Sequence, residues 1–250
     1  MSKLLKLTLG PHRLVNAVQI HSALDILDAI AALELPTSRP VLVLVGGASG
    51  ISATTMTQLR SFFNDLLAPL VEELGLTVID GGTDAGVMQL MGQARAHIQG
   101  TFPLVGVAAI GTVKLPQVQA MFAEATALEP NHTQVILVPG RQWGDESPWI
   151  SQVASELSQS APSATLLVNG GQITWKDATN SVLAGRSLLV LAGSGRTADT
   201  LAAMYRGMQP NVPAGQLMTS GLMQVIDLAQ PFGAIAATLR SLYAPLPPSH

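Results

Sequence analysis

Apolar positions along this chain follow two different periods, which predict strands that alternate with helices. Residues 41–45 (Val-Leu-Val-Leu-Val) are apolar at every position, as is typical of a central strand buried on both faces of a parallel sheet. Beyond the glycine-rich segment 46–50, apolar residues recur at intervals of three and four from Leu59 to Leu74. This period predicts a helix, and Gly75 is a natural residue for its C-terminal end.

The unit of strand, loop and helix recurs through the rest of the chain. Further strands are predicted over 76–79, 104–110, 135–138, 165–168, 188–192 and 222–228. Further helices are predicted over 87–98, 147–159, 174–184, 198–208 and 232–243. Alternating strands and helices with short connections favour an α/β fold, in which a doubly wound, mainly parallel sheet has helices on both faces.

The first 40 residues precede this repeating unit, and we interpret them as an N-terminal extension. Residues 1–10 are expected to form an edge strand or an ordered arm. Over 13–33, apolar residues fall at helical spacing, which predicts a helix. The expected division is therefore a strand and helix extension over 1–40, a doubly wound domain over 41–244, and a flexible, proline-rich tail over 245–250.

The composition argues mainly against certain partners and sites. Of the 250 residues, 48% are hydrophobic and 12% are charged, and the formal net charge is -3. Lys and Arg are nowhere concentrated, so electrostatics does not favour nucleic acid as a partner. The chain has no cysteine and no H-x-x-x-H pair, so we expect no disulfide and no built-in metal site. Because no window holds about 18 uninterrupted apolar residues, we expect no membrane span and a cytoplasmic protein.

Four glycine-rich loops follow predicted strands, and this position places them on one rim of the sheet. The loops are 46–50, 81–86, 170–171 and 193–196. In doubly wound sheets, ligands bind beyond the carboxyl ends of the strands, where the strand order reverses. Backbone N–H groups at the helix N-termini that follow such loops favour phosphate. We therefore predict that the four loops converge on a pocket for a phosphorylated ribose.

The predicted site combines these glycines with polar side chains nearby. Arg196 offers a planar cation fitted to phosphate or carboxylate, and hydroxyl groups near the first loop suit phosphate or ribose. Any one of these loops alone is equally consistent with a structural turn. The residues predicted to contact the ligand are Gly46, Gly47, Ser49, Gly50, Gly81, Gly82, Thr83, Asp84, Gly86, Glu129, Asn131, His132, Gly170, Gly171, Gly193, Ser194, Gly195, Arg196 and Asp199.

Two aspartates of this set also have structural interpretations. Asp84 is placed to accept hydrogen bonds either from ribose hydroxyls or from the N-terminus of the following helix, and capping is the better default. Asp199 follows Arg196 by three positions in the first helical turn. It can pair with Arg196, interact with the helix dipole, or hold a ribose.

The polar cluster of Glu129, Asn131 and His132 precedes the strand predicted over 135–138. A lone histidine beside an apolar run is more often structural, but its polar neighbours give the functional interpretation equal weight. In that interpretation, His132 binds the ligand or exchanges a proton near neutral pH.

Four segments, in order, resemble the LSDAT branch of the SLOG superfamily. They are Gly-Gly-Thr-Asp-Ala-Gly-Val-Met at 81–88, Leu-Glu-Pro-Asn-His-Thr at 128–133, Gly-Gly at 170–171 and Gly-Ser-Gly-Arg-Thr-Ala-Asp at 193–199. This branch includes the N-terminal cytosolic region of the melastatin-type (TRPM) channels and stand-alone prokaryotic relatives. The resemblance implies a Rossmann-like fold that binds nucleotides or their derivatives, with NAD-derived molecules such as ADP-ribose as suspected ligands.

These observations leave three functions open. The preferred one is a module that binds or senses a nucleotide derivative. The second is a nucleotide-processing enzyme similar to the LOG phosphoribohydrolases, which cleave an N-glycosidic bond and carry Pro-Gly-Gly-x-Gly-Thr followed by a glutamate. This chain has Ala192-Gly193-Ser194-Gly195-Arg196 instead, and the candidate catalytic carboxylates are Asp84, Glu129 and Asp199. In the third, the loops are architectural and the protein is a scaffold. The apolar segment 13–33 and the resemblance also predict a homo-oligomer.

Overall fold

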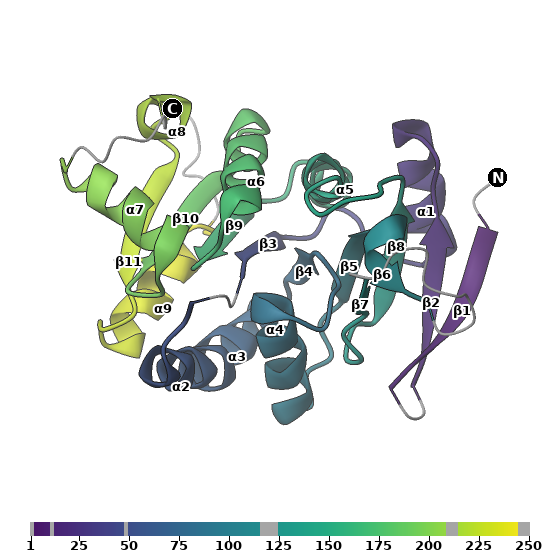
Figure 1. Ribbon diagram of the computed structural model, residues 1–250, viewed down its shortest axis with the longest axis horizontal. Helices are drawn as coiled ribbons and strands as arrows, with labels where there is room; N and C mark the ends of the chain where they lie inside the picture. The colour runs from purple at the N-terminus through teal and green to yellow at the C-terminus, as the bar shows by residue number, and fades with distance from the viewer. Residues whose placement is uncertain (1–2, 11–12, 48–49, 116–124, 209–214, 245–250) are drawn as a thin grey trace.

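The computed structural model describes residues 3–10, 13–47, 50–115, 125–208 and 215–244 of the chain. Within these residues, nine strands form one sheet through the middle of the molecule (Figure 1). The strands β6 (Val113–Lys114) and β7 (Thr126–Ala127) form a separate parallel pair. The strands of the large sheet are β1 (Lys3–Leu9), β2 (Arg13–Gln19), β3 (Val41–Gly46), β4 (Thr77–Asp80), β5 (Leu104–Ala109), β8 (Gln134–Val138), β9 (Ser163–Val168), β10 (Ser187–Ala192) and β11 (Met223–Asp227).

The strand order of the large sheet is β1-β2-β8-β5-β4-β3-β9-β10-β11. Neighbouring strands are parallel except β1 and β2, which pair antiparallel at one edge. From β3, the sheet extends one way through β4, β5 and β8, and the other way through β9, β10 and β11. The order therefore reverses between β3 and β9, which pair from Val41↔Ser163 to Gly46↔Val168. In doubly wound sheets, such a reversal opens a crevice at the carboxyl ends of the two strands.

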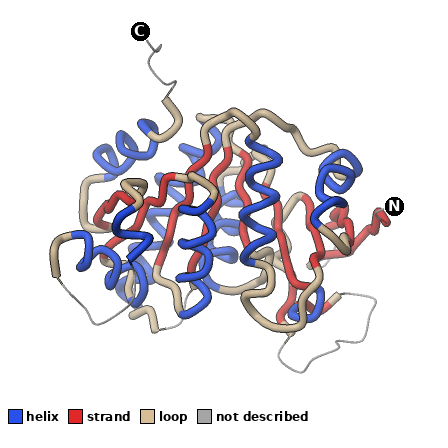
Figure 2. The backbone as a smooth tube through the Cα atoms, turned by 90° about the horizontal axis from the view of Figure 1, so that it is seen from above, coloured by secondary structure: helices blue, strands red, loops and turns tan. Residues whose placement is uncertain are grey.

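Helices cover both faces of the sheet, and the residues of β3 show why. Val41, Val43 and Val45 pack into one hydrophobic layer, whereas Leu42 and Leu44 pack into the other. Seen from above, helices of one face cross in front of the strands (Figure 2). The predicted α/β fold, a doubly wound and mainly parallel sheet, is confirmed. One face carries α1 (Ile26–Ala32), α5 (Ser147–Ser158), α6 (Gln172–Leu183), α7 (Arg196–Tyr205) and α8 (Gly215–Thr219), and the other carries α2 (Ala53–Ser61), α3 (Ala68–Glu73), α4 (Gly86–His97) and α9 (Phe232–Ser241).

The structure corrects the prediction of a helix over 13–33. Arg13–Gln19 forms β2, which pairs antiparallel with β1 and parallel with β8, and helical structure begins only at the 3-10 turn η1 (Ala23–Asp25). Val15 and Ala17 are buried whereas Leu14 is exposed, which is the alternation of a strand. The apolar positions of this segment also satisfy a helical period, so the period alone did not separate the two structures. The edge strand expected within residues 1–10 is present as β1.

The long helix predicted over 59–74 contains a π-helical segment. α2 continues into the π-helix η2 (Phe62–Leu67), which continues into α3. Pro69 stands in the first turn of α3, and in a continuous α-helix its ring would clash with the carbonyl group of Asp65. The wider π turn accommodates this proline. The same turn places the fully buried rings of Phe62 and Phe63 edge to face, with centroids 5.6 Å apart.

The predicted tail over 245–250 lies outside the described residues, so its flexibility stays a prediction. The division into an extension over 1–40 and a domain over 41–244 also stays a prediction, although β2 continues the same sheet as the rest of the chain. No helix in the described ranges is long and apolar enough to cross a membrane.

Candidate functional site

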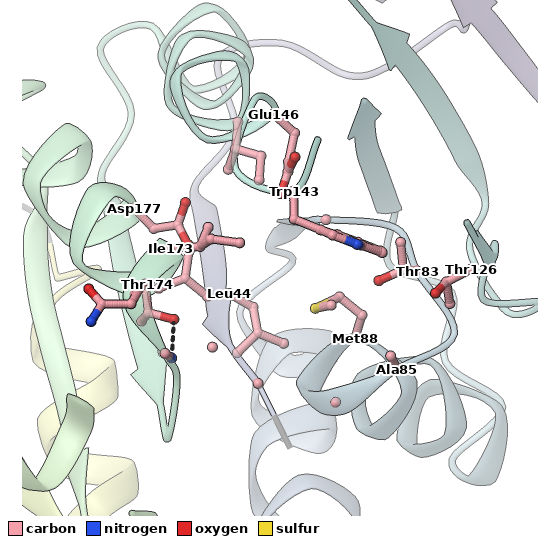
Figure 3. A pocket seen from close by; sticks show the side chains of 18 of the residues that line it. Leu44, Thr83, Ala85, Met88, Thr126, Trp143, Glu146, Ile173, Thr174 and Asp177 are labelled. Carbon is pink, nitrogen blue, oxygen red and sulfur yellow. Dashed lines mark hydrogen bonds between the residues drawn. The ribbon is translucent and has the colours of Figure 1, made fainter. Parts of the chain in front are cut away.

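A cavity of about 400 Å³ lies where the strand order reverses (Figure 3). Its walls come from the carboxyl end of β3, from the loops that follow β4, β8, β9 and β10 with the first turns of the next helices, and from β7. This is the place where doubly wound sheets bind ligands. The cavity is lined by Leu44, Val45, Gly46, Gly47, Gly81, Thr83, Ala85, Gly86, Met88, Thr126, Trp143, Glu146, Ile150, Gly171, Gln172, Ile173, Thr174, Asp177 and Arg196.

Four helices begin at this cavity, and the N-cap side chain of none of them caps the first turn. The N-cap residues are Ala85 for α4, Glu146 for α5, Gly171 for α6 and Gly195 for α7. At α6, the hydroxyl oxygen of Thr174 accepts a hydrogen bond from the N–H of Gly171 at 3.1 Å. The first N–H groups of a helix have no partner within the helix, and the helix dipole makes this end positive. Because Ala85, Glu146, Gly171 and Arg196 line the cavity, four positive helix ends adjoin the same space.

Gly46 allows β3 and β9 to approach closely at the edge of the cavity. Its φ is +146°, and a Cβ at this position would lie 1.9 Å from the carbonyl oxygen of Val168. Only glycine fits such a contact. At Gly47, in contrast, the nearest atom to a Cβ would be the Cα of Gly170, at 3.9 Å. Gly46 is therefore required by the sheet, whereas Gly47 leaves open space beside the cavity.

Arg196 brings a cation to the same part of the cavity. Its φ of 45° is left-handed, a conformation that residues other than glycine rarely adopt. The guanidinium lies against Gly171, with Nη2 3.2 Å from the position that a Cβ of Gly171 would take. No carboxylate in the described part of the chain forms an ion pair with this guanidinium. Arg196 is therefore available to an anionic ligand.

Two buried carboxyl groups line another part of the cavity, and neither was predicted from the sequence. Glu146 and Asp177 are each 9% exposed. The N–H of Gly144 donates to Oε1 and Oε2 of Glu146 at 3.2 and 3.0 Å, whereas Oδ1 of Asp177 has no hydrogen-bond partner. Burial raises the pKa of both groups, and the nearby charge of Glu146 helps to raise the pKa of Asp177 to about 7.

The wall of the cavity between Arg196 and the two carboxyl groups is apolar. Leu44, Ile173, Met88 and Trp143 lie around the middle of the cavity (Figure 3). Trp143 comes from the loop between β8 and α5 and is 37% exposed. The cavity thus has a positive part at the helix N-termini, an apolar middle, and a part rich in hydrogen-bond acceptors at Glu146 and Asp177.

The structure brings members of all four predicted loops to this cavity. Ser49 lies outside the described residues. Contact of any of these residues with a ligand stays a prediction. The predicted residues that line the cavity are Gly46, Gly47, Gly81, Thr83, Gly86, Gly171 and Arg196. The predicted residues that do not line it are Gly50, Gly82, Asp84, Glu129, Asn131, His132, Gly170, Gly193, Ser194, Gly195 and Asp199.

Glu129 and His132 belong to a buried network behind the loop between β4 and α4. Nε2 of His132 is 2.8 Å from Oδ1 of Asp80, and Nδ1 is 2.9 Å from Oε2 of Glu129. Asn131 donates its side-chain amide to Oε1 of Glu129, and the N–H of Gly82 donates to Oδ1 of Asp80. Burial alone would lower the pKa of His132, but Asp80 and Glu129 raise it to about 10. A histidinium between two carboxylates therefore holds this loop in place.

The two remaining aspartates make local hydrogen bonds. Oδ1 of Asp84 accepts a hydrogen bond from Nε2 of Gln89 at 2.9 Å. Oδ1 of Asp199 accepts one from the N–H of Gly193 at 2.6 Å, which closes the loop before α7. Asp199 makes no ion pair with Arg196. Asp84 therefore does not cap α4, whose N-cap is Ala85, and Asp199 lies in the first turn of α7 without pairing with Arg196.

The sequence does hold a signal for Asp177. Thr174, Asp177 and Ser181 are polar residues at helical spacing, and all three are buried on the inner face of α6. A polar stripe on the buried face of a helix marks either a hydrogen-bond network or a site. Glu146 had the weaker signal of a polar loop that follows a strand. That the two carboxyl groups share one cavity depends on how α5 and α6 pack, which no local pattern shows.

The fold and the cavity define a Rossmann-like, doubly wound domain with a candidate ligand site at the reversal of its strand order. The family model described as "SLOG in TRPM, prokaryote" matches residues 39–236, and the chain belongs to this family. The family resemblance read from the four segments is thus confirmed. No group of three or more His, Asp or Glu side chains in the described residues is arranged to hold a metal ion.

Individual relatives are distant and much longer than this chain. Transient receptor potential cation channel subfamily M member 2 of mouse is 23% identical over 223 residues, and the same channel of rat is 24% identical over 231 residues. These matches cover 75% and 78% of this chain, but 14% and 15% of the channels. The X-ray structure of TM1055, a structural genomics target, superimposes with a TM-score of 0.55 at 16% identity, covering 81% of this chain and 99% of that chain. This likeness supports the fold.

Proposed function

We propose that this chain binds a nucleotide or nucleotide derivative in the cavity, with the phosphate at Arg196 and the adjoining helix N-termini. The observation that carries the proposal is that a guanidinium without a carboxylate partner in the described residues lies against Gly171 at the start of α6, in a cavity that the first turns of α4 and α7 also line. Helix N-termini and arginine side chains each favour phosphate. NAD-derived molecules such as ADP-ribose are the candidate ligands, in line with the family resemblance.

The size and lining of the cavity support a ligand of this kind. Its volume of about 400 Å³ falls in the range of small-molecule sites, roughly 300–1,000 Å³. Such sites are mainly apolar, with a few polar groups that fix the orientation of the ligand. Here Leu44, Ile173 and Met88 supply the apolar wall, and Arg196 supplies the charge.

Arg196→Ala is expected to weaken nucleotide binding by at least about tenfold, because it removes charge-assisted hydrogen bonds to the phosphate. Isothermal titration calorimetry with ADP-ribose, NAD, cyclic ADP-ribose and adenosine 5′-monophosphate (AMP) measures the effect. Arg206→Ala is the matched control, since Arg206 follows α7, pairs with Asp227 at 3.4 Å and does not line the cavity. If none of these nucleotides binds the wild-type protein, or if Arg196→Ala binds as tightly as wild type, the proposal is wrong.

One observation favours a second candidate function, cleavage of an N-glycosidic bond. None of the carboxylates proposed for this reaction from the sequence, Asp84, Glu129 and Asp199, lines the cavity, but Glu146 and Asp177 do. Glycoside hydrolysis uses one protonated and one ionised carboxyl group. Incubation of AMP and NAD with the protein, followed by chromatography, tests this function. Release of adenine or nicotinamide supports cleavage, whereas a nucleotide that binds and returns unchanged supports binding alone.

A homo-oligomer and a cytoplasmic location are also proposed. Leu4, Leu14, Leu24 and Leu27 are 48%, 69%, 91% and 57% exposed on β1, β2 and the helical segment that follows them. Exposed apolar side chains of this number form a surface that a second copy of the chain can cover. Light scattering tests the oligomer, and the mass of a single chain would contradict it.

A further inference from the structure

We propose that Trp143, Glu146 and Asp177 form a base-recognition end of the cavity, and that this end selects nucleotides whose base carries an exocyclic amino group. The inference rests on the proposed function, because it takes the phosphate of the ligand to lie at Arg196. It adds the orientation of the ligand and the class of base.

The three side chains line the cavity from three segments, and the indole of Trp143 extends from beside Glu146 towards Thr83 and Thr126 (Figure 3). Glu146 stands at the start of α5, Trp143 lies in the loop before it, and Asp177 projects from α6. Figure 3 shows Glu146 and Asp177 in the upper part of the pocket with Trp143 beside Glu146, whereas Ala85 at the start of α4 lies at the opposite side. A molecule that spans the cavity therefore meets the Arg196 guanidinium and the start of α6 with one part and the two carboxyl groups with the other.

Asp177 has an unmet requirement for a hydrogen-bond donor. Its side chain is 9% exposed, and Oδ1 accepts no hydrogen bond from the described residues. Buried polar atoms nearly always have a partner, and one that lacks it inside a cavity indicates a ligand or water in that place. Glu146 receives backbone N–H groups of its own loop, from Gly144 and from Glu146 itself, so its carboxyl oxygens also retain free lone pairs. This end of the cavity is rich in acceptors.

An acceptor-rich end favours the base that presents more N–H donors and no carbonyl oxygen to the two carboxyl groups. Adenine and cytosine carry an amino group with two N–H donors, where hypoxanthine and uracil carry a carbonyl oxygen and one neighbouring ring N–H. The amino nitrogen donates to a carboxylate, whereas the carbonyl oxygen places its lone pairs against those of the carboxylate. Burial and the nearby charge of Glu146 raise the pKa of Asp177 to about 7, whereas the hydroxyl of Ser147 lowers it. Asp177 is therefore expected to act purely as an acceptor above this pH, where its carboxyl group is ionised.

Trp143 supplies the flat surface that a base requires. Its side chain lines the cavity next to Glu146 and is 37% exposed, so part of the indole is free to contact a ligand. Aromatic side chains stack on all bases, because every base has a π face. Trp143 is therefore expected to add affinity without selecting the base, and the carboxyl groups are expected to make the selection.

The test compares nucleotides that differ only in the amino group. Calorimetric titration of the wild-type protein is expected to give at least about tenfold tighter binding of AMP than of inosine 5′-monophosphate (IMP), and likewise of the cytidine than of the uridine monophosphate. In Asp177→Asn the ratio is expected to fall towards one, since the amide offers the base a donor as well as an acceptor. Glu146→Gln provides a second variant. Glu156 is exposed on α5, the helix whose N-cap is Glu146, and it does not line the cavity. The control variant Glu156→Gln is therefore expected to keep the wild-type ratio.

Three outcomes overturn the inference, and the third of them also contradicts the proposed function. Equal affinities within both pairs of nucleotides would overturn it and leave the proposed function standing. A wild-type ratio in both Asp177→Asn and Glu146→Gln would show that other residues select the base. Failure of all four nucleotides and of ribose 5-phosphate to bind would contradict the proposed function together with the inference.

Discussion

His132→Gln is expected to lower the free energy of unfolding by about 3–5 kcal/mol near neutral pH, because it removes the cation from between two buried carboxylates. Asp80 and Glu129 are 0% and 1% exposed, so water cannot replace the lost charge. Oδ1 of Asp80 also accepts a hydrogen bond from the N–H of Gly82 at 2.7 Å. The loop between β4 and α4, which lines the cavity, is therefore expected to become less ordered in this variant. Urea unfolding followed by circular dichroism measures the change.

The same network predicts a pH dependence of stability. The pKa of His132 is raised from 6.5 to about 10 in the folded protein, so the folded state retains a proton that the unfolded state releases. The stabilisation is therefore fully present below about pH 6.5 and is lost as the pH rises to about 10. Within this window, the free energy of unfolding is expected to fall by up to about 1.4 kcal/mol per pH unit. His132→Gln should remove this slope.

His97→Gln is the matched control for both effects, since His97 is exposed at the end of α4. It is expected to change the free energy of unfolding by no more than about 0.5 kcal/mol. The account of the network fails if His132→Gln is as stable as His97→Gln, or if it keeps the same dependence on pH between 6.5 and 10 as the wild-type protein.

Gly46→Ala is expected to destabilise the protein by more than about 3 kcal/mol, because both the backbone conformation and the space at this position exclude a side chain. A Cβ would lie 1.9 Å from the carbonyl oxygen of Val168, and the φ of +146° is unfavourable for alanine. Relief of the clash requires β3 and β9 to separate at the reversal of the strand order. The midpoint of thermal or urea unfolding measures the loss.

Gly47→Ala separates the strand contact from the general effect of a glycine replacement. The nearest atom to its Cβ would be 3.9 Å away, and its φ lies outside the left-handed region. We expect it to change stability by less than about 1 kcal/mol. Equal stability of Gly46→Ala and Gly47→Ala would show that the close approach of β3 and β9 is not required.

The fold could be predicted from the sequence where the pattern was unambiguous. Residues 41–45 are apolar throughout, and they form an interior strand of the sheet, at the point where the strand order reverses. Over 13–33 the apolar spacing suits either a strand or a helix, and pairing of β2 with β1 and β8 decides for the strand. The pairing of β2 with β8 joins residues more than 100 positions apart, for example Val18 and Ile136, which no local period can show.

The residues of the candidate site also fall into those that the sequence could predict and those that it could not. Gly46, Gly81 and Gly171 could be placed at one rim because each follows a parallel strand, and the position of a strand end is a consequence of topology. Glu146 and Asp177 could not be brought together, because their proximity depends on the packing of α5 against α6. The sequence around His132 favours a functional and a structural role equally, and its position between two carboxylates is visible only in three dimensions.

The central claim, that the cavity holds a phosphorylated nucleotide, is tested most directly by crystal structures of the protein soaked with AMP and with ADP-ribose. The account predicts a phosphate within hydrogen-bonding distance of the Arg196 guanidinium and of first-turn N–H groups of α4, α6 or α7. It also predicts the adenine ring between Trp143 and Asp177. A nucleotide bound elsewhere on the chain, or an empty cavity at saturating nucleotide, would contradict it.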